Sequence, residues 1–243
     1  MSVTGKGVLV VGGGSGIGAA CALLFAERGA KVAIAGRRME RLQETAAKFS
    51  GEPPIACHVA DVADRDSVGR LVAWATERLG QIDVVVIAAG INIPNRTMHA
   101  LRPEDWDRVM AINATGAYNV MHAVLPQMRQ RRDGLIVNIS SIAGKRAAAL
   151  GGVAYNASKF AMTALGLSVA DEERENGIRV TNIYPGEVDT PILQQRPEPV
   201  SAERRARMLK PEDVAAAVLL AAELPPRANL LEVVIKPTVQ QYV

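Results

Sequence analysis

The N-terminal segment holds the feature that most constrains the fold. A short apolar run at residues 8–11 has the composition of a buried strand and leads directly into a glycine-rich stretch at 12–18. An alanine-rich segment with helical character follows, as far as Arg28. In this order, glycines let the backbone bend sharply and approach a pyrophosphate at the helix N-terminus, so the segment predicts a dinucleotide site rather than a flexible loop. The predicted contacts in the turn are Gly12, Gly14, Ser15, Gly16, Ile17 and Gly18.

The rest of the chain alternates apolar runs with helical segments. Strands are predicted near residues 7–12, 31–36, 54–59, 83–89, 134–140, 178–184 and 231–236, and helices near 16–28, 38–49, 65–79, 103–130, 154–176 and 211–223. The strands are apolar without alternation, which is typical of a parallel sheet covered by helices on both faces. The pattern therefore predicts one α/β domain over residues 1–243, a doubly wound parallel sheet of about seven strands.

Tyr155 and Lys159 form the second informative motif. On a helix this spacing places both side chains on one face, with Cβ atoms about 5–6 Å apart. A free phenol titrates near pH ~10, and a fixed ammonium nearby draws its pKa down toward neutrality. The pair predicts a general acid and base, although the same spacing also fits two neighbours on a solvated helix.

Together these motifs resemble the short-chain dehydrogenase/reductase (SDR) family, in the family's order over residues 6–237. The matching segments are Gly12-x-x-x-Gly16-x-Gly18, Asp61-Val62, Ala89-Gly90, Ile112-Asn113-Ala114-Thr115-Gly116, Asn138-Ile139-Ser140-Ser141, Tyr155-x-x-x-Lys159 and Pro185-Gly186-x-x-x-Thr190. The resemblance implies a Rossmann-type fold and an oxidoreductase. Such an enzyme transfers a hydride between a nicotinamide and the carbonyl or alcohol carbon of a small-molecule substrate.

The resemblance also implies roles for four side chains, Asn113, Ser141, Tyr155 and Lys159. Tyr155 would exchange a proton with the substrate oxygen, and Ser141 would hydrogen-bond that oxygen. Lys159 would hold the nicotinamide ribose hydroxyls, and Asn113 would support a water that connects Lys159 to solvent. Asn113 also fits a buried amide that satisfies helix backbone, and Ser140 fits a structural hydroxyl at a strand end.

Further cofactor contacts are implied after the third, fourth and sixth predicted strands: Asp61, Val62, Ala89, Gly90, Pro185, Gly186, Val188 and Thr190. Asp61 would accept from the adenine amino group, and its alternative is a helix N-cap, for which Asp64 is the better candidate. Thr190 and the Val188 amide would serve the carboxamide or pyrophosphate, although Pro-Gly is also a common turn.

Cofactor choice follows from the end of the second predicted strand. An acidic residue there would bind the ribose 2′-hydroxyl of NAD(H) and repel a 2′-phosphate. Gly36 holds that position and Arg37 and Arg38 follow it. Because a guanidinium binds phosphate in a bidentate fork, we predict NADP(H) over NAD(H), with Arg37 as the main ligand and Arg38 as the second. The alternative is two solvated arginines at a helix start.

The chain departs from the family pattern at two places that affect the turn. Val11 replaces a threonine before the first glycine, and Ile87-Ala88 replaces two asparagines at the end of the fourth predicted strand. These positions could face each other, so that an apolar contact replaces a polar one. The interval between Ser141 and Tyr155 is one residue longer than the commonest spacing, which a loop can absorb.

Composition excludes several other classes. No stretch lacks charges for the roughly 18 residues of a membrane span, and the two cysteines lack metal-ligand spacing, which predicts a cytoplasmic protein without metal. The net charge of +3 and the arginines at 204–207 could suggest nucleic acid. Aromatic residues make up only 4% of the chain, so a solvated lid helix is preferred, within a substrate lid at about 187–210.

Alternative functions and the substrate class remain open. A non-catalytic NADP(H)-binding regulator typically lacks the tyrosine or the lysine of this motif, whereas Tyr155 and Lys159 are both present here. An extended epimerase or dehydratase has a larger C-terminal domain, for which this chain is too short. The predicted pocket borders are 91–95, 147–153 and 187–210, where lid arginines could meet a substrate carboxylate. The stretch at 224–240 resembles reductases of 3-hydroxy acids. Relatives are homotetramers or homodimers, which pack through the helices near 103–130 and 154–176.

Overall fold

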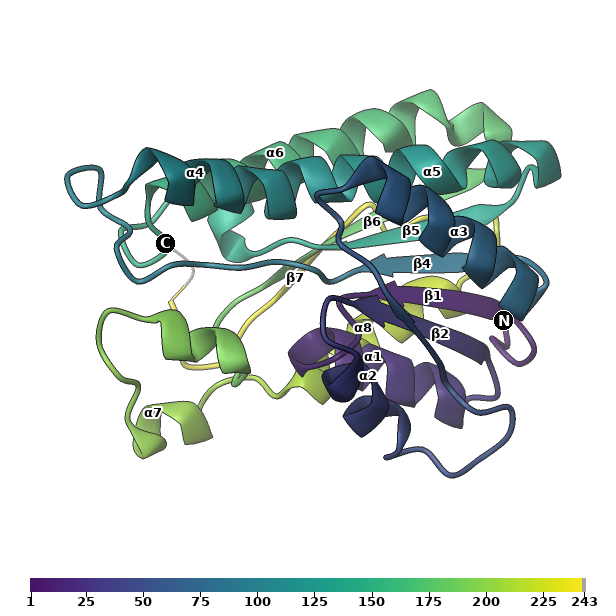
Figure 1. Ribbon diagram of the computed structural model, residues 1–243, viewed down its shortest axis with the longest axis horizontal. Coiled ribbons are helices and arrows are strands. Elements are labelled where there is room, and N and C mark those ends of the chain that lie inside the picture. Colours follow the sequence, from purple (N-terminus) through teal and green to yellow (C-terminus); the bar gives the residue numbers. More distant parts are fainter. Residues whose placement is uncertain (242–243) are drawn as a thin grey trace.

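The computed structural model describes residues 1–241 and is built on a seven-stranded parallel sheet (Figure 1). The strands are β1 (Gly7–Val11), β2 (Lys31–Gly36), β3 (Ala56–Val59), β4 (Val84–Ile87), β5 (Gly134–Ile139), β6 (Ile178–Pro185) and β7 (Glu232–Ile235). Their order across the sheet is β3-β2-β1-β4-β5-β6-β7, and every neighbouring pair is parallel. This is the predicted Rossmann-type doubly wound sheet.

Helices cover both faces of the sheet. They are α1 (Gly16–Glu27), α2 (Met39–Ala46), α3 (Arg65–Leu79), α4 (Pro103–Met110), α5 (Gly116–Arg131), α6 (Val153–Glu172), α7 (Ala202–Ala206) and α8 (Pro211–Glu223). Helices α3, α4, α5 and α6 lie on one side of the sheet, and α1 and α8 pack together on the other (Figure 1). Short 3₁₀ turns span Ile142–Gly144, Arg174–Asn176 and Pro191–Gln195.

Side chains of the central strands pack into two separate hydrophobic cores, one on each face of the sheet, because alternate residues of a strand point to opposite faces. Leu9 and Val11 of β1 pack with the helices α3, α5 and α6, whereas Val8 and Val10 pack with α1 and α8. All five residues of β1 are buried. Full burial of one Val or Leu side chain stabilises the fold by about 1.5–3 kcal/mol, which is why these strands read as unbroken apolar runs.

The helix predicted over 103–130 is wrong in one respect, because the structure divides it. A π-helical turn, Ala111–Thr115, separates α4 from α5. The wider turn directs the Asn113 side chain at the loop after β4, where it bonds the main chain of Ile91. Single π turns are rare in helices and occur frequently at functional sites.

The predicted lid, residues 187–210, is more ordered than its irregular sequence suggests. Pro191 opens a 3₁₀ turn, and α7 begins after Ser201, whose Oγ accepts from Arg204 N at 3.2 Å.

The helix predicted over 154–176 ends earlier, at Glu172, and a separate 3₁₀ turn follows it.

Candidate active site

The glycine turn between β1 and α1 is pressed against the end of β4. Gly12 has φ of 92°, and a Cβ there would lie 2.5 Å from Ala89 N. A Cβ on Gly18 would lie 2.2 Å from Gly12 O. Neither position can carry a side chain without moving backbone, so the chain bends tightly into the first turn of α1 as predicted.

The N-terminus of α1 suits an anion. Ser15 is its N-cap residue and makes no side-chain capping bond, and the first turn contains no acidic residue. Free backbone N–H groups and the positive end of the helix dipole favour a phosphate at such a position. These residues therefore fit the pyrophosphate of a dinucleotide.

The departures from the family pattern at Val11 and Ile87 face each other as expected. The two residues are register partners of β1 and β4, both are buried, and Ala88 N donates to Val11 O at 2.8 Å. An apolar contact and a main-chain hydrogen bond hold the turn to β4 here.

The start of the predicted lid lies against the glycine turn. A Cβ on Gly16 would be 3.2 Å from Thr190 Cγ2. Gly186 extends β6 through a bond from its N to Ile235 O at 2.7 Å, and a Cβ there would meet Gln240 Oε1 at 2.3 Å. Pro185 and Gly186 are therefore part of a packed strand end rather than an isolated turn.

The side chains predicted for the adenosine end lie at the ends of β2 and β3. Arg37 and Arg38 are exposed where β2 ends and α2 begins. Asp61 Oδ1 accepts from Ala63 N at 3.0 Å, and Asp64 caps α3 by accepting from Asp66 N at 2.9 Å. The alternative of Asp61 as a helix cap is wrong, and Asp64 is the cap as predicted. Val62 is buried.

Ser141 and Tyr155 are brought together across the end of β5. The Ser141 hydroxyl accepts from Ala143 N at 3.1 Å, and it lies near enough to the Tyr155 phenol to lower the pKa of that phenol by hydrogen bonding. Ser140 points elsewhere: its buried hydroxyl donates to Lys159 O at 3.3 Å and lies 3.3 Å from Thr163 Oγ1. Ser140 has the structural position that was predicted for it.

Lys159 lies in the interior of the same region. Its side chain is buried, and Nζ donates to Ile139 O at 2.8 Å while lying 5.7 Å from the centroid of the Tyr155 ring. A Cβ on Gly90 would be 3.5 Å from both Lys159 Nζ and Asn113 Oδ1. The loop after β4 thus touches the glycine turn through Ala89 and the Lys159 amine through Gly90.

Asn113 is fully buried and has several partners. Oδ1 accepts from Ile91 N at 2.8 Å, and Nδ2 donates to Ile91 O at 2.9 Å and to Ser158 Oγ at 3.0 Å. The Ser158 hydroxyl in turn donates to Tyr155 O at 2.8 Å. The amide therefore satisfies loop backbone and connects it to α6, rather than satisfying helix backbone, and the predicted water contact stays a prediction.

The expected effect of Lys159 on Tyr155 is wrong. Burial raises the pKa of the Tyr155 phenol, and the hydrogen bond from Ser141 and the charge of Arg96 oppose that rise. Burial also lowers the pKa of Lys159 to about 8. The cation that favours the phenolate in this structure is Arg96, which the sequence did not single out.

The basic residues of the predicted lid are bound within the lid itself. Glu187 Oε1 accepts from Arg196 at 2.8 Å and from Arg204 at 2.7 Å, and Asp189 binds Arg205 and Lys210 in the same way. The prediction of a solvated lid is wrong for Arg196, whose side chain is only 12% exposed. Three of the four lid arginines thus already have a carboxylate.

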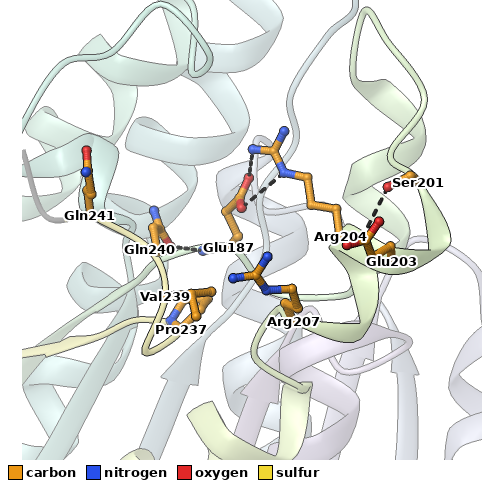
Figure 2. A pocket seen from close by; sticks show the side chains of 9 residues that line it. All are labelled: Glu187, Ser201, Glu203, Arg204, Arg207, Pro237, Val239, Gln240 and Gln241. Carbon is orange, nitrogen blue, oxygen red and sulfur yellow. Dashed lines mark hydrogen bonds and ion pairs between the residues drawn. The ribbon is translucent and has the colours of Figure 1, made fainter.

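A cavity of about 500 Å³ lies between α7 and the C-terminal segment (Figure 2). Arg204 reaches Glu187 on its wall, and Gln240 Oε1 accepts from Glu187 N at 2.9 Å. Arg207 lies beside Pro237 and Val239 without an ion pair to any described residue. Glu187 and Glu203 also line the cavity, so positive and negative side chains are mixed there.

Residues 1–241 hold neither a metal cluster nor a membrane-spanning helix. No group of three or more His, Cys, Asp or Glu side chains is placed to hold a metal ion. None of the helices in this range has the length and apolar character that crossing a membrane requires.

Known proteins identify the family. The chain matches the short chain dehydrogenase family over residues 6–201 and belongs to it. An uncharacterised oxidoreductase of Listeria innocua is 34% identical over the whole of both chains. The chain is therefore an SDR oxidoreductase.

Solved structures agree with this assignment and differ in cofactor. The closed form of a serine dehydrogenase with NADP⁺ is 32% identical, with a TM-score of 0.88 over 97% of this chain and 96% of the other. A 3-ketoacyl-(acyl-carrier-protein) reductase of Brucella melitensis with NADH is 27% identical, with a TM-score of 0.87 over 98% and 99%. A nicotinamide cofactor is common to both.

Proposed function

We propose that the protein is an NADP(H)-dependent oxidoreductase that acts on carbonyl and alcohol groups, with Tyr155 as the general acid and base. The placement of the Ser141 hydroxyl near the Tyr155 phenol, where it can lower the pKa of that phenol by hydrogen bonding, carries this proposal. It places two hydroxyls side by side at the sheet edge that also carries the glycine turn and the buried amine of Lys159. A substrate oxygen that accepts from both hydroxyls would be oriented and protonated at one point.

The dinucleotide would be held by residues from several strand ends. The glycine turn and the N-terminus of α1 would bind the pyrophosphate, Asp61 the adenine amino group, and Pro185 to Thr190 the carboxamide end. When bound, the nicotinamide supplies or accepts the hydride. The chain itself supplies the orientation and the proton.

Preference for NADP(H) is supported by the end of β2. Gly36 offers no carboxylate to a ribose 2′-hydroxyl, and the exposed guanidinium groups of Arg37 and Arg38 are free to approach a phosphate. Arg37 would be the main ligand because its fork matches two phosphate oxygens. The relative solved with NADP⁺ is consistent with this choice, and the relative solved with NADH makes the test necessary.

The proton steps follow from the positions of the side chains. In reduction, Tyr155 donates to the developing alkoxide while Ser141 hydrogen-bonds the same oxygen; in oxidation, Tyr155 accepts the proton. Lys159 Nζ donates to Ile139 O at 2.8 Å and to Met162 Sδ at 3.7 Å, which leaves one N–H group for the ribose hydroxyls. Asn113 would hold a water beside Lys159 and so connect the phenol to solvent.

A substrate panel tests the proposal. Aldehydes, ketones and keto acids are supplied with NADPH or NADH, and loss of reduced-nicotinamide absorbance is followed. Turnover that is faster with NADPH supports the whole proposal, whereas faster turnover with NADH overturns the cofactor preference. Tight NADPH binding without turnover of any carbonyl would favour the alternative, a regulatory NADP(H)-binding protein.

A further inference from the structure

Arg96 is a buried arginine in the loop between β4 and α4, and its side chain joins three separate segments. Nε donates to Ile93 O at 2.9 Å, Nη1 to Leu150 O at 2.6 Å and Nη2 to Gln195 O at 2.5 Å. Ile93 belongs to its own loop, Leu150 to the loop before α6 and Gln195 to the predicted lid. These three segments are the three predicted borders of the substrate pocket.

The backbone of Arg96 is fitted to the start of α6, the helix that carries Tyr155 and Lys159. Arg96 O accepts from Val153 N at 3.0 Å. Gly152 has φ of 80°, and a Cβ there would lie 2.3 Å from Arg96 Cβ. A glycine is therefore required at position 152 both by the backbone conformation and by the approach of Arg96.

The charge of Arg96 is not neutralised by a neighbouring carboxylate. The hydrogen bonds of its side chain within residues 1–241 are to main-chain carbonyls. Burial lowers the pKa of Arg96, and the charged side chain that acts on it most strongly is Arg196, which lowers this pKa further and is itself bound by Glu187 at 2.8 Å. A guanidinium keeps its proton even when buried. Its field is also stronger in the protein interior than in water.

Three groups face the Tyr155 phenol from the elements packed against it. Lys159 lies on its own helix, Ser141 lies on the loop after β5, and Arg96 lies on the loop after β4. Burial raises the pKa of the phenol, and the Ser141 bond and the Arg96 charge both oppose that rise. Arg96 thus acts on the oxygen that would exchange the proton, without being bonded to it.

We propose that Arg96 is a positioning residue of this site: its guanidinium holds the predicted lid and the loop before α6 against the loop after β4, and it directs a positive charge toward the Tyr155 phenol. The proposal depends on the proposed function for the role of Tyr155 in turnover. Its geometric part depends only on the three hydrogen bonds.

Two substitutions separate the fork, meaning the three hydrogen bonds of the guanidinium, from its charge. Arg96→Met removes the hydrogen bonds and the charge and keeps much of the volume. Arg96→Lys keeps the charge but cannot make the three hydrogen bonds together. Arg179→Met is the matched control, because Arg179 also donates to three main-chain carbonyls, those of Ala221, Leu224 and Ala228, but lies at the opposite end of β6 from Pro185.

The first measurement is the ionisation of Tyr155 in the protein without cofactor. It is obtained as the difference in phenolate absorbance between each protein and the same protein carrying Tyr155→Phe. We expect the pKa of Tyr155 to rise by about one unit in Arg96→Met and to stay unchanged in Arg96→Lys and Arg179→Met. An unchanged pKa in Arg96→Met, or an equal rise in Arg96→Lys, overturns the role of the charge.

The second measurement is limited trypsin cleavage after the lid arginines. Both Arg96 variants should be cleaved several-fold faster than the unmodified protein and Arg179→Met, because the predicted lid has lost its bond at Gln195. Unchanged cleavage in both variants overturns the role of the fork. If Arg96→Met does not fold, Arg96→Lys alone decides, through an unchanged phenol pKa together with faster lid cleavage.

The third measurement is the pH profile of kcat/KM with any carbonyl that the panel identifies. In Arg96→Met the limb that reports Tyr155 should move to higher pH by the same amount as the phenol titration, and in Arg96→Lys KM should rise while the limb stays in place. A limb that does not move in Arg96→Met overturns the inference. Absence of turnover in the unmodified protein would overturn the proposed function instead, and the two cofactor-free measurements would still decide the role of Arg96.

Discussion

Asn113 and Ile91 are joined by two hydrogen bonds, one from Ile91 N to Oδ1 at 2.8 Å and one from Nδ2 to Ile91 O at 2.9 Å. The side-chain amide thereby pairs with both main-chain polar groups of Ile91, a loop residue after β4, as a neighbouring strand would do inside the sheet. A π-helical turn is the local distortion that brings the amide to this position. The same side chain continues to Ser158, and so ties the loop after β4 to α6.

The first prediction concerns this link. Asn113→Ala leaves the N–H and C=O of Ile91 without partners, so the free energy of unfolding should fall by about 2–4 kcal/mol. Urea unfolding followed by circular dichroism measures the change. Asn156→Ala is the control, because within residues 1–241 the Asn156 side chain makes one hydrogen bond, to Ala148 O at 2.9 Å, and its loss should cost about 1 kcal/mol or less. Equal losses in the two variants would contradict a special role for Asn113 in the fold.

A second prediction concerns the proton donor. Tyr155→Phe removes one hydroxyl and should lower turnover of any identified substrate by a factor of at least about 10², with cofactor affinity nearly unchanged. Tyr118→Phe, on the exposed surface of α5, should keep full turnover. Steady-state rates and a fluorescence titration with NADPH give the two quantities. Full turnover in Tyr155→Phe would remove Tyr155 from the mechanism.

Much of this fold was predictable from the sequence, because buried parallel strands leave unbroken apolar runs. All seven strands overlap the predicted ranges, and the apolar runs are unbroken and buried in β1 and β4. The tight turn at Gly12 and Gly18 follows from residues without a Cβ. The chain's own departures at Val11 and Ile87 also face each other, because they end the neighbouring parallel strands β1 and β4. These features are local in sequence or follow from strand order.

Other features could not be predicted, because they depend on contacts between distant residues. The apolar periodicity runs through Ala111–Thr115 without a break, so the π turn leaves no mark in the pattern. Arg96 looks like any loop arginine until Leu150 and Gln195 are placed beside it. The pKa of Tyr155 was expected to fall because the spacing to Lys159 was known, but the extent of burial was not.

A third prediction concerns the cofactor. Arg37→Ala should lower kcat/KM with NADPH by about 10- to 100-fold and leave the value with NADH nearly unchanged, because only NADPH carries the 2′-phosphate. Arg38→Ala should have a smaller effect of the same kind. Arg41→Ala is the control, since Arg41 is the next arginine along the chain and is engaged by Glu44 at 2.7 Å. Equal losses with both cofactors in Arg37→Ala would show that Arg37 does not read the phosphate.

A fourth prediction concerns subunit contacts. Phe160 on α6 and Tyr118 on α5 are each 42% exposed, and the two helices run side by side on one face (Figure 1). If they form the interface of a homodimer or homotetramer, Phe160→Glu should reduce the assembly to smaller species in sedimentation equilibrium. Leu220→Glu, on the exposed side of α8, should leave the assembly unchanged. The opposite pattern would place the interface at α8.

The last prediction follows from the burial of Lys159. Its pKa is lowered from 10.5 to about 8, so between these values the unfolded chain binds a proton that the native protein has released. The free energy of unfolding rises with pH wherever the unfolded chain holds more protons than the native protein, so it should rise across this interval. Below about pH 8 the native protein keeps the buried charge, and the full energetic penalty of burying it lowers the stability. Urea unfolding without cofactor at several pH values from 7 to 10 measures this.

The comparison with Lys159→Met isolates this group from others that titrate in the same range. As pH increases from 8 toward 10, the free energy of unfolding should increase more in the unmodified protein than in Lys159→Met. For one proton the difference between the two proteins changes by at most about 1.4 kcal/mol per pH unit. Lys6→Met is the control, because the Lys6 side chain is 44% exposed and should show no such gain. A difference between the unmodified protein and Lys159→Met that stays constant with pH would mean that the buried amine keeps its proton throughout. In that case Lys159 would carry its full charge beside Tyr155 at every pH where the enzyme is assayed.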